Sequence, residues 1–292
     1  MEFNETGLFK FASHAYELSK RVVKPYRSRF SKKTYTQHQH LTILLLKAKT
    51  KSKFHEMEEF LVVSPILQQA LELTQVPDHT SMCRALQHLK PLVFQLLLVL
   101  SGRLLPASGK LAVDSTGFDR RHASKHYVKR SKMTLSSMKT TYAVDTKSLA
   151  ILGVNTTVTR RHDSQIILPL VKKVKRHFPV KVCCADRGYD SKEIRDELRK
   201  ASVRPLIKHR EFTNLDKAHN KRMKPEDYNQ RVKGESVNSS VKRKTGDTLT
   251  TKTYWRQHKE SLIKAITHNL NRHINRQITL AYTRIATKLK YS

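Results

Sequence analysis

The sequence is poor in cysteine, in acidic residues and in long apolar runs. Its three cysteines show no metal-binding spacing and are odd in number, which argues against a disulfide framework. The longest apolar run, Leu92 to Leu100, is interrupted by Gln95 and is much shorter than the roughly 20 residues of a membrane span. The first residues lack the charged start and apolar centre of a signal peptide. We therefore expect a cytoplasmic protein, associated with the nucleoid and not with a membrane.

Acidic residues are few relative to basic ones. The chain has 24 Asp and Glu against 57 Lys and Arg, which gives a formal net charge of +33 and an isoelectric point near 10.3. Such an excess of one charge repels itself unless a polyanion neutralises it. DNA or RNA is therefore the expected partner. An anionic membrane surface is the weaker alternative, because no basic amphipathic anchor or lipidation signal stands out.

The first third of the chain reads as helical. With 292 residues the chain is long enough for one large or two unequal domains, and we expect residues 1–105 to form an all-α region. Helices are predicted over Thr36–Ala48, Lys53–Val62 and Ser81–Leu89. Short consecutive helices with basic joints favour a helix-turn-helix-like DNA-binding region. A helical bundle that packs on a catalytic domain is an equally good interpretation.

After a boundary at Ser101–Lys110, residues 106–292 are predicted to form an α/β domain with a mixed sheet flanked by helices. The predicted strands are Leu111–Val113, Lys139–Asp145, Leu149–Thr157, Val180–Ala185 and Arg204–Ile207. The predicted helices are Ser164–His177, Ser191–Ala201, Tyr228–Lys242 and Tyr254 to about Ile285. Residues 208–227 contain almost no apolar side chains, which predicts a mobile loop that orders on nucleic acid. The basic stretch Arg120–Lys132 is interpreted as a loop or hairpin that contacts phosphate, or as a solvated loop.

Three acids follow or lie near these elements. Asp114 ends the first predicted strand, Asp186 ends the fourth, and Glu235 lies on the helix after the fifth. In a mixed sheet, sites gather at the carboxyl edge of the parallel strands, so the three could meet there. Three carboxylates within a few ångströms require divalent cations or protonation. Oxygen ligands without convergent His or Cys favour two Mg²⁺ ions, for which Mn²⁺ can substitute. Two such ions, bridged in our interpretation by Asp114, would support phosphoryl transfer between DNA strands.

The segment around Glu235 has a regular charge pattern. Tyr228, Arg231, Glu235 and Lys242 have offsets of 0, 3, 7 and 14 residues, which places them near one stripe if the segment is a single helix. A lone carboxylate among cations is expected where the carboxylate binds a metal ion and the cations bind the phosphates of a polyanion. Taken alone, however, an acid on a basic helix is more often a solvated surface residue.

The same residues carry a family resemblance. They match the Y-x2-R-x3-E-x6-K signature, and the motifs at Val113–Thr116 and Ala185–Asp190 accompany it in the expected order. Over about Leu111–His273 the chain resembles a DDE transposase of a prokaryotic insertion sequence, of the insertion-sequence-four and insertion-sequence-five group. The resemblance implies an RNase H-like fold, two bound Mg²⁺ and three metal ligands that are also the catalytic residues, namely Asp114, Asp186 and Glu235.

The resemblance also implies a DNA partner and its contacts. Tyr228, Arg231 and Lys242 would touch the transposon-end DNA, and we expect Arg187 and Lys244 to contact DNA as well. The partners are then double-stranded DNA, both terminal inverted repeats and target, and a second copy of the chain in a homodimer. The predicted activity is metal-dependent cleavage followed by strand transfer. An RNase H-like nuclease without strand transfer and a catalytically inactive DNA-binding protein are the alternatives.

Other polar residues are assigned ordinary roles. We interpret four further acids as turn or cap residues rather than ligands: Asp119, Asp145, Asp163 and Asp190. Three histidines are expected to face phosphate or solvent: His122, His126 and His162. Tyr254 and Trp255 could stack on a base, but core packing explains them equally well.

Overall fold

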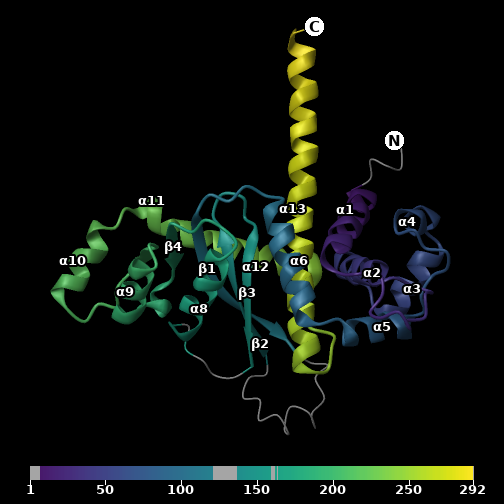
Figure 1. Ribbon diagram of the computed structural model, residues 1–292. Coiled ribbons are helices and arrows are strands. Elements are labelled where there is room, and N and C mark those ends of the chain that lie inside the picture. The colour runs from purple at the N-terminus through teal and green to yellow at the C-terminus, as the bar shows by residue number, and fades with distance from the viewer. Residues whose placement is uncertain (1–6, 121–136, 159–161, 163, 292) are drawn as a thin grey trace. The chain divides into compact units, whose positions relative to one another are not determined.

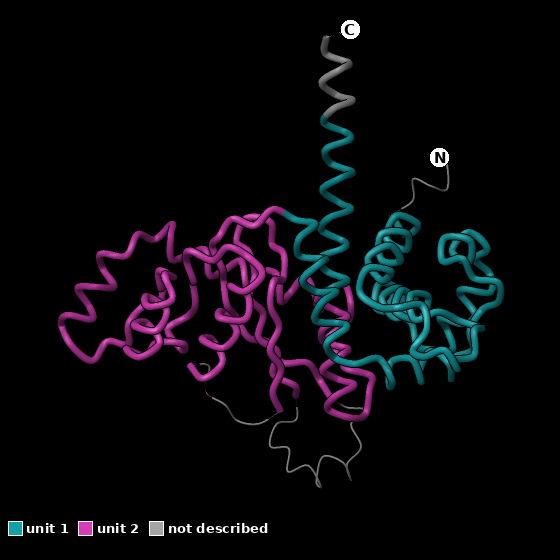
Figure 2. The backbone as a smooth tube through the Cα atoms, viewed as in Figure 1, with its two compact units in different colours: residues 1–105, 266–292 teal, residues 106–265 magenta. Residues whose placement is uncertain are grey.

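The structure is a computed structural model that describes residues 7–120, 137–158, 162 and 164–291, with side chains to residue 283. Most of the basic stretch Arg120–Lys132, with His122 and His126, and Asp163 lie outside the described residues. The chain divides into two compact units (Figure 2). The first contains residues 1–105 and 266–292, and the second contains residues 106–265.

The first unit is helical throughout its described part (Figure 1). Its helices are α1 (Gly7–Val22), α2 (Gln37–Thr50), α3 (Phe54–Val62), α4 (Pro65–Ala70), α5 (His79–His88) and α6 (Pro91–Arg103), followed much later by the end of α13 (Tyr254–Tyr291). The helices predicted over Thr36–Ala48 and Lys53–Val62 are confirmed as α2 and α3, because Thr36 and Gln39 form a capping box and α3 begins right after Lys53. The helix predicted at Ser81 begins two residues earlier, since Asp78 caps it by accepting the N–H of Ser81 at 2.9 Å.

No single helix of the described chain is both long enough and apolar enough to cross a membrane. Only α5 and α6 taken together pass by length and composition, and they meet at a bend of 90°.

The second unit is built on a five-stranded sheet in the order β3-β2-β1-β4-β5. Its strands are β1 (Lys110–Asp119), β2 (Ser137–Asp145), β3 (Ile151–Thr157), β4 (Val182–Ala185) and β5 (Arg204–Ile207). The first three are antiparallel neighbours, and β4 and β5 run parallel to β1. The predicted mixed sheet is therefore confirmed, with β1 at its centre.

Helices flank this sheet. They are α8 (Ser164–Lys175), α9 (Lys192–Lys200), α10 (Asn214–Arg222), α11 (Pro225–Tyr228), α12 (Val232–Thr245) and the start of α13, with the 3-10 turns η2 (Arg187–Tyr189) and η3 (Asn229–Arg231). Helix α8 packs on β2 and β3, and α12 packs on β1 and β2. Apolar side chains of α12 that point to the sheet, Val237 and Val241, are buried.

Three predictions about these elements are wrong. Residues 208–227 are not one loop, because Thr213 and Asp216 form a capping box that starts α10, and Pro225 starts α11. The first strand does not end at Asp114 but continues to Asp119, since β2 pairs with it along that whole length.

The segment from Tyr228 to Lys242 is likewise not one α-helix, because η3 separates α11 from α12. Tyr228 and Val237 are both buried. At about 100° per residue, an ideal helix would place residues nine positions apart half a turn from each other. The tighter 3-10 turn brings the two side chains closer to the same face.

Candidate active site

The register of the sheet places Asp114 and Asp186 side by side. Parallel pairing of β1 with β4 ends where Val113 pairs with Ala185. Asp114 is the next residue along β1, and Asp186 is the residue that follows β4, so both lie at the carboxyl end of β4. Asp114 is half-buried within β1, while Asp186 is exposed at the start of η2.

Helix α12 brings Glu235 to the same place. Gly234 lies against the central strand so closely that a Cβ atom built on it would be 2.8 Å from the Cβ of Asp114. That contact is tighter than real Cβ atoms adopt, so the approach requires glycine at this helical position. Glu235, the next residue, is exposed beside this contact.

The other two acids act on the electrostatics of Asp114. Burial raises the pKa of the Asp114 carboxyl, and the negative charges of Glu235 and Asp186 raise it further. Hydrogen bonds from the N–H of Ser115 and from Asn238 act in the opposite direction. The net shift is upward, which means that the protein destabilises the ionised form of Asp114 unless a cation is added.

Asn238 is a site residue that the sequence patterns did not indicate. Its side-chain Nδ2 donates to Oδ2 of Asp114 at 2.7 Å. Its Oδ1 atom is buried and accepts no hydrogen bond from the residues that the structure describes. Its spacing of three residues from Glu235, on the same helical face, is the signal that could have identified it.

Tyr228 and Arg231 lie just before α12 and interact with the acids. Tyr228 is buried, and its hydroxyl donates to Oδ1 of Asp186 at 3.4 Å. Burial raises the pKa of the Tyr228 hydroxyl, so it remains a protonated donor. The Arg231 guanidinium forms an ion pair with Glu235 and lies 5.4 Å from the ring centroid of Tyr228. The guanidinium also interacts electrostatically with Asp186, so Arg231 offsets negative charge on two of the three acids.

The remaining predicted DNA contacts lie further along the same elements. Arg187 follows Asp186 directly, is exposed, and pairs with Glu211 at 3.0 Å. Lys242 lies two turns after Glu235 on α12, with its Nζ 5.7 Å from the ring of Phe118. Lys244 is half-buried near the end of α12.

Two of the competing acids, Asp145 and Asp190, have structural roles, although Ser191 and not Asp190 caps α9. Asp190 forms an ion pair with Arg195 and accepts the N–H of Arg210 at 2.9 Å. Asp145 accepts the N–H groups of Lys147 and Ser148 in the turn between β2 and β3. The oxygens of these two carboxylates already bind groups of the same chain.

Tyr254 and Trp255, at the start of α13, are interpreted either as residues that stack on a base or as core residues, and the structure separates the two. The hydroxyl of Tyr254 donates to the carbonyl of Thr156 at 3.2 Å, so this residue is tied to β3. Trp255 packs edge-on against Tyr254 but remains 61% exposed. Only Trp255 is therefore available to stack on a base.

The donor atoms of the site fit a hard divalent cation. Three carboxylates and a buried amide oxygen without a donor present only oxygen ligands. Their like charges are close enough to oppose one another, and a divalent cation would relieve this repulsion. The three acids at the carboxyl end of the central strands therefore form a candidate site for divalent cations.

Comparison with family models identifies the family of the chain. The transposase DDE domain matches residues 106–270, which is more than half of the chain, and the chain belongs to this family. No curated protein matches the chain. A solved synaptic complex of piggyBac transposase with hairpin DNA is similar, with 10% identity over 96% of this chain and 74% of that one, at a TM-score of 0.47.

Proposed function

We propose that this protein is an insertion-sequence transposase of the insertion-sequence-four and insertion-sequence-five group, with an RNase H-like catalytic unit. It binds transposon-end DNA, cleaves it and joins the 3′-hydroxyl to target DNA. The observation that carries the proposal is the meeting of Asp114, Asp186 and Glu235 within the family-matched residues. Each acid comes from a separate element of the chain, and the sheet register and Gly234 bring them together.

Asp114, Asp186 and Glu235 would hold the metal. Their oxygen-only donor set suits Mg²⁺ or Mn²⁺, and three carboxylates carry enough charge for two ions. When bound, a pair of such ions supplies activation of the attacking hydroxyl and stabilisation of the leaving oxygen. Asp114 is the proposed bridging ligand, because it lies on the central strand between β4 and α12.

The neighbouring side chains position these acids and bind the DNA. Asn238 fixes one oxygen of Asp114, and the Tyr228 hydroxyl fixes one oxygen of Asp186. Arg231 holds Glu235 until DNA phosphates compete for the guanidinium. We propose that Lys242, Lys244 and Arg187 contact phosphates beside the scissile bond, because all three lie on α12 or next to Asp186. Tyr228 is only 7% exposed, so little of its side chain is available to DNA.

The helical unit is the proposed second DNA contact. A hollow among α2, α5 and the segment before α2 is lined by Ala85 and Leu89 and by six polar or basic residues: Arg27, Gln37, His40, Ser81, Arg84 and His88. Its two arginines, Arg27 and Arg84, would bind phosphate groups. Replacing Arg27 and Arg84 together by alanine should weaken binding of end DNA and reduce the salt slope of log K by about 2. Unchanged binding and slope would remove this unit from the DNA interface.

The two ends of an element must be held together for joining, so we propose that a homodimer binds them. The nucleoid is the corresponding location in the cytoplasm.

The test is a cleavage and strand-transfer assay on labelled DNA that carries the sequences flanking this gene, with Mg²⁺ or with EDTA. We expect nicked ends and joined products only with metal. Cleavage without joined products would favour the nuclease. Binding without cleavage, in Mg²⁺ and in Mn²⁺, would favour the inactive DNA-binding protein. The control is Glu226→Gln, which changes an exposed acid outside the site.

A further inference from the structure

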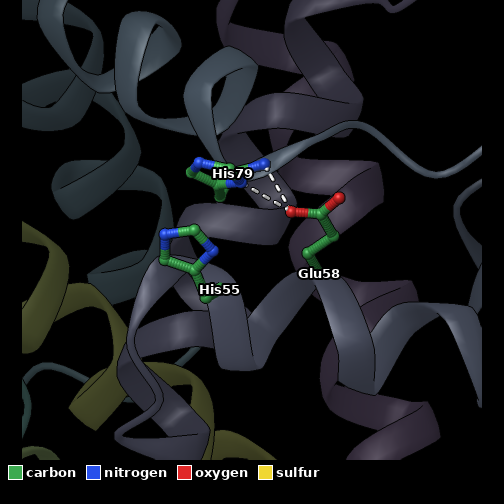
Figure 3. Close-up of side chains that lie close together, drawn as sticks. All are labelled: His55, Glu58 and His79. Atoms are coloured by element: carbon green, nitrogen blue, oxygen red, sulfur yellow. Dashed lines mark hydrogen bonds and ion pairs between the residues drawn. The ribbon is translucent and has the colours of Figure 1, made fainter.

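A second group of metal-binding side chains lies in the helical unit. His55 and Glu58 come from α3, three residues apart on one face, and His79 is the first residue of α5. One ligand atom from each of the three lies within 4.8 Å of the others. Figure 3 shows the three side chains pointing toward one another. It is the one such group of His, Cys, Asp or Glu found in the described part of the chain.

Hydrogen bonds already organise two of the three residues. Glu58 Oε2 accepts the backbone N–H of His79 at 2.9 Å and lies 2.8 Å from its ring Nδ1. These bonds lower the pKa of the Glu58 carboxyl, so it is ionised. A capping role at the start of α5 would explain this pair alone.

Capping does not explain His55. Its ring stacks on the ring of His79 with centroids 3.6 Å apart, and it makes no hydrogen bond to any described residue. The two imidazoles are held face to face beside a carboxylate, with one ring nitrogen of each histidine and one oxygen of Glu58 within 4.8 Å of one another. A shared cation accounts for all three positions, whereas a helix cap accounts for two.

We propose that His55, Glu58 and His79 bind a Zn²⁺ ion. Two imidazole nitrogens and one carboxylate oxygen form a borderline donor set that zinc accepts, in contrast to the oxygen-only set of the acid site. The residues line an open hollow of about 470 Å³ together with Glu59, Val62 and Val63. The hollow leaves room for a water molecule as the fourth ligand.

The bound ion would link α3 to α5. Glu58 and His79 are 21 residues apart, and α4 lies between them. Because the three ligands come together only in the folded state, binding of the ion to that state adds stability by mass action. The ion would therefore fix α3 against α5, and α5 also lines the proposed DNA hollow.

The test uses the full chain after removal of metal with EDTA. Zn²⁺ is titrated by calorimetry in an Asp114→Asn background, so that the acid site does not compete. His55→Ala removes a ligand and leaves both hydrogen bonds between Glu58 and His79 intact. Glu58→Gln keeps an acceptor for the His79 N–H. His88→Ala, an exposed histidine on α5, is the matched control.

We expect one Zn²⁺ per chain, affinity at least about tenfold weaker in His55→Ala and Glu58→Gln, and unchanged affinity in His88→Ala. Saturating Zn²⁺ should raise the melting temperature by about 5 °C or more in the parent and by much less in His55→Ala. Co²⁺ bound in place of zinc should give the visible absorption of nitrogen ligation. Equal zinc affinity in the parent and His55→Ala, or no bound zinc in the parent, would overturn the proposal. If Glu58→Gln does not fold, His55→Ala still decides the question.

Discussion

Two sets of carboxylates within residues 106–265 differ in how the protein meets their charge. Asp145 is fully buried and accepts the N–H groups of Ser108, Lys147 and Ser148 at 2.6 to 3.0 Å. Glu260 likewise accepts the backbone N–H groups of Thr250 and Thr251. Asp114, by contrast, has one side-chain donor and two like charges beside it.

The difference separates structural acids from site acids. A carboxylate that accepts several N–H groups is stabilised in its ionised form by the fold itself. A carboxylate next to other carboxylates makes the fold less stable, and it is retained where a ligand compensates the charge. Asp114 has this second arrangement, with Asp186 at the end of β4 and Glu235 at the start of α12 beside it.

The largest effect should come from removing the site acids. Asp114→Asn, Asp186→Asn and Glu235→Gln should each lower metal-dependent cleavage of end DNA on the order of 10³-fold or more. Binding of the DNA should stay within about threefold, since no cation is lost. Cleavage rates and gel-shift affinities measured on the same preparations check this. Retention of cleavage in any of the three would remove that residue from the site.

A structural acid should show the opposite pattern. Asp145→Asn turns an amide NH₂ toward N–H donors that lose their acceptor, so the free energy of unfolding should fall by about 3 kcal/mol. Urea denaturation followed by circular dichroism measures it. Asp196→Asn is the control, because its exposed ion pair with Arg199 is worth less than about 0.5 kcal/mol. Equal stability of the two variants would contradict the distinction.

Gly234→Ala tests whether close packing of α12 positions the site. An added Cβ would meet the Cβ of Asp114 at 2.8 Å, so the helix or the acid must shift. We expect cleavage to fall about 10- to 100-fold. Gly7→Ala, where a Cβ meets nothing within 4 Å, should leave activity unchanged. If the contact were loose, alanine would instead stabilise the helix by about 1 kcal/mol with full activity.

The smallest effect concerns stability without metal. In EDTA, Asp114→Asn removes one of three like charges while the amide oxygen can still accept from Asn238. The variant should be as stable as the parent or more stable, by about 1 kcal/mol. Added Mg²⁺ should then stabilise the parent but not the variant. Thermal melts with and without Mg²⁺ provide the measurement, and a variant that is clearly less stable in EDTA would place Asp114 among the structural acids.

Local signals made much of the fold predictable. The capping box at Thr36 and Gln39 lies within four residues, and the strand Arg204–Ile207 stands between polar segments. Asp114, Asp186 and Glu235 could be named because each lies in a short motif. Elements whose stability is local therefore appear in the sequence.

Elements that depend on distant contacts were not predictable. Helix α10 is an exception, because its capping box of Thr213 and Asp216 is local, but the helix has no buried residue and its polar sequence resembles a loop. The 3-10 turn η3 depends on which side of the helix Tyr228 is buried. The role of Asn238 depends on how far α12 approaches β1, which Gly234 decides.

The most direct test of the acid site is a count of bound Mn²⁺. Electron paramagnetic resonance of free Mn²⁺, titrated into the metal-free full chain with end DNA present, gives the number of ions held. The account predicts two ions per chain in the parent, a loss of this binding in Asp114→Asn, and no loss in Glu226→Gln. Equal binding by the parent and Asp114→Asn would contradict it.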